Sequence, residues 1–243
     1  MSKELPFQFE KQFEVLSFQI DPQGRIRLSA LADLMQEVAW KHANSKDFGK
    51  NLFELGLMWV LSRMEIKVHH LPSWGDEILV KTAGRGIDKL LALREFRVED
   101  RKGNVLAEAM SAWILLDGQS KRPQRPGNVL PSELFAQVSA DEVWVPKKID
   151  LTENPYISDS IKVKPFDVDM NNHVNNVSYI RWIEDFCSEQ NIPFNGLLIN
   201  YLSEAKTGNE VGLSLEKKEN AWILSGFQLG RPVFVSRISE LGY

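Results

Sequence analysis

The pattern of apolar and polar positions predicts two amphipathic helices, one in each half of the chain. Apolar side chains recur at helical spacing within residues 20–43, and the same spacing returns within residues 174–187. Each helix has an apolar side that is broad enough to be buried. The apolar positions are Leu28, Leu31, Leu34, Met35, Val38 and Ala39 in the first helix, and Val174, Val177, Ile180, Ile183 and Cys187 in the second.

Runs of β-branched, aromatic and aliphatic residues surround both helices and predict strands, with polar or glycine-containing turns between them. One run precedes each helix and four follow it. A long helix followed by an antiparallel meander predicts an α+β fold in which a sheet wraps around a central helix, once in each half. The predicted strands are 9–21, 57–68, 76–86, 89–99 and 105–117 in the first half, and 161–169, 197–205, 209–218, 221–229 and 233–241 in the second.

The two halves align with each other, which predicts an internal duplication. With an offset of 148 positions, Asp21 coincides with Asp169 and the apolar positions of the two helices coincide. Further along, "GDEI" at 75–78 resembles "GNEV" at 208–211. The shared features therefore extend from the helix into the strands that follow it.

A proline-rich and charged segment, residues 118–160, joins the halves and predicts a connector with at most one short helix. A structureless loop of this length is uncommon inside one compact domain. We therefore expect two domains, residues 1–120 and residues 159–243, joined by a linker over residues 121–158.

The composition excludes several classes of protein. The chain has 243 residues, 43% apolar and 26% charged, which is sufficient for real globular cores. A single cysteine excludes an internal disulfide, and with only four histidines a structural zinc site is not expected. No signal peptide or apolar run of membrane-spanning length is present, so we expect a cytoplasmic protein. The net charge of −4 indicates no general affinity for nucleic acid.

The candidate chemistry lies in "KPFDVDMNNHVNNVSYIRWIEDF", residues 164–186. Asp169, Asn171 and His173 alternate, which places them on one face of an extended loop directly before a helix. The free N–H groups at a helix start favour negative charge. Hydrolysis of an ester or thioester needs such donors for the oxyanion, with a base and a carboxylate beside them. Taken singly, each residue also fits an ordinary loop and helix cap.

The corresponding positions of the first half hold Asp21, Gln23 and Arg25. Of the two loops, only the second contains a side chain that titrates near neutral pH, because histidine stands where the first has arginine. This difference predicts one active copy and one supporting copy.

The stretch "DVDMNNHVNNVSYIRWIED" resembles the signature of the acyl-acyl carrier protein (acyl-ACP) thioesterases of plants and bacteria. Its Asn-x-His-Val-Asn-Asn run followed by Tyr-Ile-x-Trp is specific for that family, and the resemblance covers nearly the whole chain. It implies a tandem, or double, hotdog fold whose second helix begins at the active site. The implied reaction is hydrolysis of the thioester between a fatty acyl chain and the carrier's phosphopantetheine arm, which releases free fatty acid. The resemblance implies neither a metal nor an organic cofactor.

By this resemblance, Asp169, Asn171 and His173 match the active-site positions of the family. Plant members also have an acid and a cysteine in a Tyr-Arg-Arg-Glu-Cys sequence after the helix, where this chain has Glu204 and Ala205. Alanine cannot act as a nucleophile, so a cysteine mechanism is excluded at that position. The remaining Cys187 lies on the apolar side of the helix, which is typical of a core thiol.

Two mechanisms remain open. In one, Glu204 and His173 position and deprotonate a water that attacks the thioester. In the other, Asp169 attacks the thioester and water hydrolyses the resulting anhydride. In both, Asn171 holds the water or the carbonyl, and amides at the helix start receive the oxyanion.

The resemblance implies that the first half supplies the acyl pocket and that an acidic acyl carrier protein is the partner. An acyl-CoA thioesterase of the same fold and a non-catalytic acyl-binding module are the alternatives. The preferred chain length stays open, as does the choice between monomer and homodimer. Candidate basic contacts for the carrier, which equally fit solvated charges, are Arg85, Lys121, Arg122, Arg125, Lys147 and Lys148.

Overall fold

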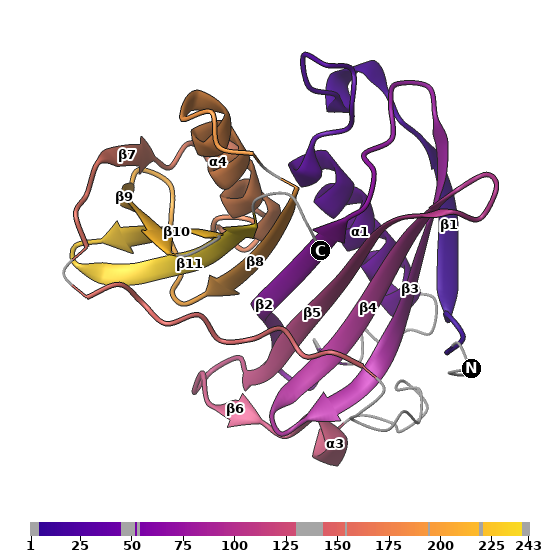
Figure 1. The fold of residues 1–243 in the computed structure, drawn as a ribbon. Coiled ribbons are helices and arrows are strands. Elements are labelled where there is room, and N and C mark those ends of the chain that lie inside the picture. Colours follow the sequence, from indigo (N-terminus) through magenta and orange to yellow (C-terminus); the bar gives the residue numbers. More distant parts are fainter. Residues whose placement is uncertain are drawn as a thin grey trace. The chain divides into compact units, whose positions relative to one another are not determined.

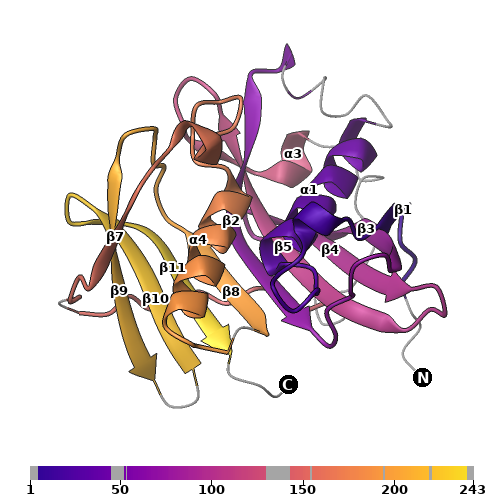
Figure 2. The same cartoon turned by 90° about the horizontal axis from the view of Figure 1, so that it is seen from above.

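The computed structural model describes residues 5–44, 52, 54–129, 143–153, 155–193, 195–218 and 221–239. The chain forms two compact units, each with one long helix against an antiparallel sheet (Figures 1 and 2). The first unit contains residues 1–61 and 68–146, and the second contains residues 62–67 and 147–243. Within the described ranges, no helix is long and apolar enough to cross a membrane.

In the first unit, the helix α1 (Leu28–Asn44) contacts the strands β3 and β1 of the sheet. Its apolar side is buried, and alternate residues of β3 such as Ile78 and Val80 are buried as well. The neighbouring strands run in the order β1 (Phe9–Glu14), β3 (Glu77–Asp88), β4 (Leu91–Asp100), β5 (Val105–Asp117) and β2 (Leu57–Val68). The short strand β6 (Pro123–Gln124) pairs with β5, and the helix α3 spans Pro126–Val129.

The second unit has the helix α4 (Asn176–Glu189) against one face of its sheet. The ring of Tyr179 on α4 meets the rings of Tyr201 and Phe234 edge-to-face, at 5.7 and 5.6 Å between centroids. Residues 62–67 of β2 begin the strand order because they belong to this unit. The order continues through β8 (Gly196–Tyr201), β11 (Arg231–Ser239), β10 (Ala221–Gln228), β9 (Glu210–Lys218) and β7 (Asp159–Lys162).

The hydrophobic pattern predicts both helices and nearly all strands, with two differences before the helices. The predicted strand 161–169 ends at Lys162, and a single 3-10 turn, η4 (Pro165–Asp167), follows it. Proline cannot donate to a strand ladder, so Pro165 begins a turn instead. The predicted strand 9–21 likewise ends at Glu14 and is followed by the 3-10 turn η1 (Ser17–Gln19).

The duplication predicted from the sequence is confirmed by matching hydrogen bonds. The bridge between Ile20 and Ile26 recurs, 148 positions later, between Val168 and Val174. The turns η1 and η4 and the first residues of α1 and α4 differ by the same offset. In the second aligned segment, Gly75 N–H donates to the carbonyl of Val15, and Gly208 N–H donates to that of Val163, both at 2.9 Å.

The described parts of the connector pack on the units themselves. Val143, Trp144 and Val145 pack on a buried cluster of the first unit that includes Leu93 and Met110. In the second unit, Ile149 N–H donates to the Asn200 side chain at 2.8 Å. One short helix, α3, is present in the described part of the connector, whereas residues 130–142 lie outside the described residues.

Candidate functional site

The loop from Asp169 to His173 is a tight turn that its own aspartate holds together. Asp169 N–H donates to the carbonyl of His173 at 2.8 Å, and Asn172 N–H donates to the carbonyl of Asp169 at 3.0 Å. The carboxylate Oδ1 of Asp169 accepts from the amides of Asn171, at 2.8 Å, and His173, at 3.4 Å. Asn172 has a φ of 59°, in the left-handed region, where asparagine is tolerated better than most residues.

The structure brings two of the predicted site residues into direct contact. His173 Nε2 lies 3.1 Å from Glu204 Oε2, with 25% of the histidine side chain and 53% of the glutamate side chain exposed. A backbone hydrogen bond of 2.9 Å from Val174 N–H to the carbonyl of Ala205 fixes the two loops side by side. Because Ala205 is buried, this connection is anchored in the core of the unit. The imidazole and the carboxylate thus contact each other at the surface, on two loops that a buried backbone hydrogen bond joins.

Asn171 and Asp169 are arranged differently. The Asn171 side chain is exposed, and its Nδ2 lies 3.3 Å from Asp169 Oδ2. The contact between Asp169 and His173 runs through the histidine backbone rather than the ring. Asp169 therefore shapes the loop that carries His173, while Asn171 presents its amide to solvent next to it.

The start of α4 leaves one amide hydrogen without an acceptor. Asn175 is the N-cap, and its side chain accepts from Val177 N–H at 3.0 Å. Asn175 N–H donates to the carbonyl of Asp167 at 2.8 Å, and Ser178 N–H donates to that of Asn175 at 2.9 Å. In the described part of the chain, Asn176 N–H has no such partner. A free amide at the positive end of a helix suits a developing oxyanion.

Tyr201 contacts the carbonyl of the same residue, Asn176, from inside the unit, a contact that the sequence reasoning missed. Its hydroxyl donates to the carbonyl of Asn176 at 3.2 Å. Burial, with a smaller effect from Tyr179, raises the pKa of the Tyr201 phenol well above its usual range, so the phenol stays protonated and remains a donor. The available signal was a tyrosine in the middle of the predicted strand 197–205, three positions before Glu204.

A second acid, Asp167, anchors the loop from below and was also missed. The residue is 5% exposed, and its carboxylate forms an ion pair with Arg181. It also accepts from Lys164 N–H at 2.7 Å and from Trp182 Nε1 at 3.3 Å. These contacts tie η4 to α4. Asp167 lies two positions before Asp169 on the same alternation, but the partners that bury it, Arg181 and Trp182, lie on the following helix.

The loop of the first unit has the same turn without the same chemistry. Asp21 Oδ1 accepts from the amides of Gln23 and Arg25, each at 2.9 Å, and Arg25 Nη2 lies 3.0 Å from Asp21 Oδ2. Burial alone would raise the pKa of Asp21, but hydrogen bonds from Arg25 and its charge outweigh burial and lower it. The alignment that joins 75–78 to 208–211 places Leu71 opposite Glu204. The first loop therefore lacks both the imidazole and the acid.

Cys187 is a core thiol, as the sequence predicts. It is completely buried, and burial, with a smaller effect from Glu184, raises its pKa to about 12. A protonated, inaccessible thiol cannot serve as a nucleophile. In the ranges that the structure describes, no group of three or more His, Cys, Asp or Glu side chains is placed to hold a metal ion.

One predicted contact for a carrier protein is wrong. Arg85 is only 2% exposed, pairs with Glu95 and donates to the carbonyl of Pro6 at 2.8 Å, so it holds the N-terminal segment on the sheet. It cannot present its charge to a partner. The other predicted basic residues are exposed, namely Lys121, Arg122, Arg125, Lys147 and Lys148.

Comparison with known proteins matches both halves of the chain to domains of one family. Residues 6–134 match the acyl-ACP thioesterase N-terminal domain, and residues 152–229 match the acyl-ACP thioesterase C-terminal domain. Among curated relatives, oleoyl-acyl carrier protein thioesterase 1 of Arabidopsis thaliana, a chloroplastic protein, is 29% identical over 201 residues. Palmitoyl-acyl carrier protein thioesterase of the same plant is 28% identical over 193 residues. Both alignments cover 72% of this chain but only 53% and 46% of the relatives, so the chain spans about half of their length.

Solved structures show the same fold over nearly the whole chain. A crystal structure of an acyl-ACP thioesterase from Bacteroides thetaiotaomicron superposes with a TM-score of 0.84 at 24% identity, covering 95% of this chain and 96% of that one. A 12:0-ACP thioesterase from Umbellularia californica gives a TM-score of 0.79 at 22% identity, with the same coverage. These likenesses confirm the predicted double hotdog. Because the family models match both halves in order, the chain belongs to the acyl-ACP thioesterase family.

Proposed function

We propose that this protein hydrolyses the thioester of fatty acyl-ACP and releases free fatty acid and carrier thiol. The contact of 3.1 Å between His173 Nε2 and Glu204 Oε2, beside the start of α4, carries this proposal. An imidazole and a carboxylate in hydrogen-bond contact form an acid–base pair, and the adjacent helix start offers an amide for the oxyanion. Membership of the family supports the substrate class.

The proposed reaction begins with a water bound next to His173. The imidazole, held by Glu204, takes a proton from this water as the oxygen attacks the thioester carbonyl carbon. Asn171 orients the water or the carbonyl, and Asn176 N–H donates to the oxyanion. The carbon–sulfur bond then breaks, and the proton on His173 passes to the leaving thiolate. The products are the fatty acid and the thiol of the carrier.

Direct attack by Asp169 has less support. Both oxygens of its carboxylate are within hydrogen-bond distance of groups in its own loop. Asp21 makes the same backbone contacts in a loop that has no imidazole, which indicates a structural role for this aspartate in both units. We therefore assign Asp169 as a positioning residue in the water route.

The division of labour between the halves is part of the proposal. We infer that the domain over residues 159–243 is the catalytic half and that residues 1–120 supply the acyl pocket, with a linker over 121–158. The buried apolar side of α1 and the missing base in the first loop support this division. A cytoplasmic location and a monomeric or homodimeric state stay predictions from the sequence.

The carrier is proposed to be acyl carrier protein, and CoA is the alternative. Exposed basic residues of the connector, including Arg122 and Lys148, support a strongly acidic protein partner through charge complementarity. The same acyl group on CoA would use the same chemistry without these contacts.

The experiment that tests the proposal measures thiol release from one acyl chain presented on carrier protein and on CoA, using the purified protein and His173→Ala. We expect faster turnover of the carrier substrate, loss of that turnover in the variant, and a rate that falls as salt is added. Preference for CoA would retain the chemistry and change the partner. Absence of release from short and long chains on both carriers would instead indicate an acyl-binding module.

A further inference from the structure

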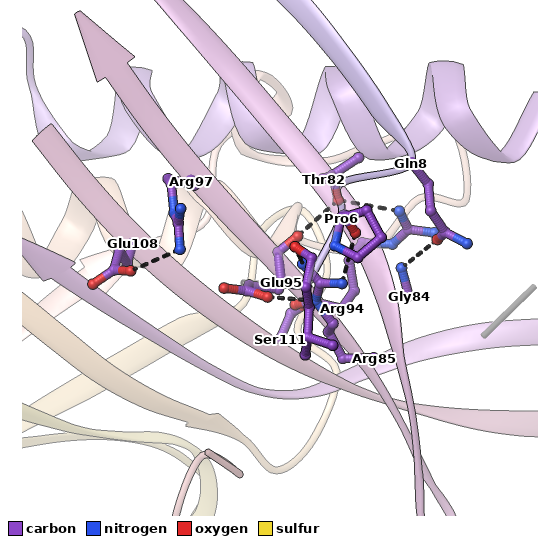
Figure 3. A network of polar contacts seen from close by, with 11 residues as sticks. Pro6, Gln8, Thr82, Gly84, Arg85, Arg94, Glu95, Arg97, Glu108 and Ser111 are labelled. Atoms are coloured by element: carbon purple, nitrogen blue, oxygen red, sulfur yellow. Dashed lines mark hydrogen bonds and ion pairs between the residues drawn. The ribbon is translucent and has the colours of Figure 1, made fainter. Parts of the chain in front are cut away.

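Arg94 lies inside the first unit, on the face of the sheet that is turned toward α1. In the β-sheet register it pairs with Gly84 of β3 and Ser111 of β5. Its Nη1 lies 3.1 Å from Nδ1 of His42, in the last turn of α1, and 3.2 Å from Oγ1 of Thr82 (Figure 3 shows the contact with Thr82). The guanidinium therefore bridges the helix and the sheet.

The two contacts of this guanidinium are with a ring nitrogen and a hydroxyl. A guanidinium can only donate, so Nδ1 of His42 is the acceptor in its contact with Arg94. The Thr82 hydroxyl donates to the carbonyl of Glu95 at 2.9 Å, so toward Arg94 it acts as an acceptor. Two other arginines of the same polar network, Arg85 and Arg97, pair with carboxylates (Figure 3). No carboxylate contacts Arg94 in the described ranges.

The contacts of Arg94 leave one edge of the guanidinium unused. Both run through Nη1, whereas Nε and Nη2 have no acceptor among the described residues. That edge presents two parallel N–H groups, the geometry that binds a carboxylate through two hydrogen bonds. Among the described residues, the end of α1 contributes partial negative charge but no acceptor at this edge.

The Arg94 side chain is largely desolvated but keeps part of its exposure to solvent. Desolvation lowers the pKa of Arg94 to about 10, so the side chain is still charged at neutral pH. Arg94 nevertheless keeps part of its accessible surface, although His42 and Thr82 are buried. Both observations fit a guanidinium whose Nε and Nη2 edge is accessible while protein surrounds its other atoms. An uncompensated charge in such surroundings is costly unless an anion completes it.

We propose that Arg94, supported by His42 and Thr82, forms a binding site for the carboxylate of an aliphatic acid inside the first unit. Buried apolar side chains of the same unit, including Met35, Val38 and Phe96, suit the alkyl part of such a ligand. The carboxylate has two chemical sources. One is a free fatty acid, and the other is a carboxylate at the far end of a thioester-linked acyl chain. The second source rests on the proposed function, whereas the first does not.

The test compares two ligands with the same chain, decanoate and decanol, by titration calorimetry on the full-length protein at neutral pH. We expect decanoate to bind about tenfold more tightly, because hydrogen bonds to a charged partner are stronger than neutral ones. Arg94→Met should abolish the preference by weakening decanoate alone, and Arg94→Lys should retain part of it. Arg97→Met removes a cation from the same strand and should leave the preference intact.

Equal affinity for the acid and the alcohol, no binding of decanoate, or an unchanged preference in Arg94→Met would each overturn the proposal. Thermal unfolding of every variant shows whether it is folded, and Arg94→Lys serves as the test if Arg94→Met is not folded.

Two rate measurements then distinguish the two sources of the carboxylate. Inhibition of thioester hydrolysis by decanoate that Arg94→Met relieves identifies the free acid. A preference for ω-carboxyacyl thioesters that the variant loses identifies the substrate. Binding of decanoate by a protein that hydrolyses no thioester would refute the proposed function while leaving this site in place.

Discussion

At the residue scale, the chemistry depends on two side chains that come from separate loops. His173 stands at the start of a helix, and Glu204 stands after a strand, in a position that would otherwise be an ordinary exposed acid. Their contact gives the imidazole a carboxylate partner at hydrogen-bond distance, which orients the ring. The neighbouring Asn176 N–H and the Tyr201 hydroxyl behind it complete the proposed site.

Replacing either member of the pair should lower the rate of hydrolysis. We expect His173→Asn to reduce kcat/KM by about 10²–10⁴, the usual contribution of a general base. Glu204→Gln should have a smaller effect, because the amide still reaches the imidazole without its charge. Initial rates of thiol release check both variants, and Cys187→Ala should remain close to the parent rate. An undiminished rate in Glu204→Gln would exclude the role proposed for this acid.

The Cys187 thiol should be unreactive in the folded protein. Its pKa of about 12 keeps it protonated at pH values where an exposed thiol begins to ionise. Because the folded-state pKa is the higher one, the contribution of this group to stability is constant below the ordinary thiol pKa and declines as the pH rises toward 12. Iodoacetamide labelling followed by mass spectrometry should show modification only with denaturant. Equal labelling rates with and without denaturant would contradict its burial.

At the scale of elements, the same turn precedes both helices. Gly24 and Asn172 occupy equivalent positions with φ of 79° and 59°, and an aspartate holds each turn through backbone amides. Conformation is thus retained in both copies while the exposed side chains differ. The turn is a structural frame, and the second unit alone equips it with an imidazole.

Substitutions at Asn172 should follow backbone conformation. Asn172→Gly should be tolerated, whereas Asn172→Val should destabilise the protein by about 1–2 kcal/mol, the cost of a left-handed conformation for a residue with a Cβ. Unfolding in urea measures both changes. Gly24→Val tests the equivalent position of the first unit and should also destabilise. A Val variant as stable as the Gly variant at position 172 would show that the turn relaxes to another conformation.

At the scale of the whole molecule, the two units share one strand. Residues 62–67 of β2 belong to the second unit and pair with β8, although they come from the first half of the sequence. The pairing includes Ile66 with Leu197 and Met64 with Ile199, and all four side chains are buried. The second unit is therefore completed by a segment that ends 80 positions before Lys147, where the rest of the unit begins.

A chain restricted to residues 147–243 should not form a stable monomer. Without residues 62–67, β8 would become an edge strand with a row of unpaired backbone groups and exposed apolar side chains, which promotes association. Size-exclusion chromatography and circular dichroism of the purified fragment check this expectation, with the full chain as control. A folded monomeric fragment would show that β8 tolerates an open edge.

Local pattern accounts for what the sequence determined by itself. Apolar spacing placed both helices and the strands, the repeat predicted two equivalent halves, and the motif around Asp169 and His173 indicated the family. Each of these depends on residues close in sequence, through helical period, strand alternation and turn chemistry. The ends of β1 and β7 were less well predicted because a 3-10 turn continues the apolar pattern of a strand.

Which distant residues meet depends on how the whole chain folds. The bond from Val174 to Ala205 brings Glu204 to His173, and strand register places Arg94 inside the first unit and Arg85 under the N-terminal segment. No short-range pattern contains this information, because contacts between distant segments depend on which strands pair and in which register. The elements, the repeat and the family therefore follow from local sequence patterns. The contacts of each charged side chain depend on how the strands pair, because the whole fold sets its burial and its partners.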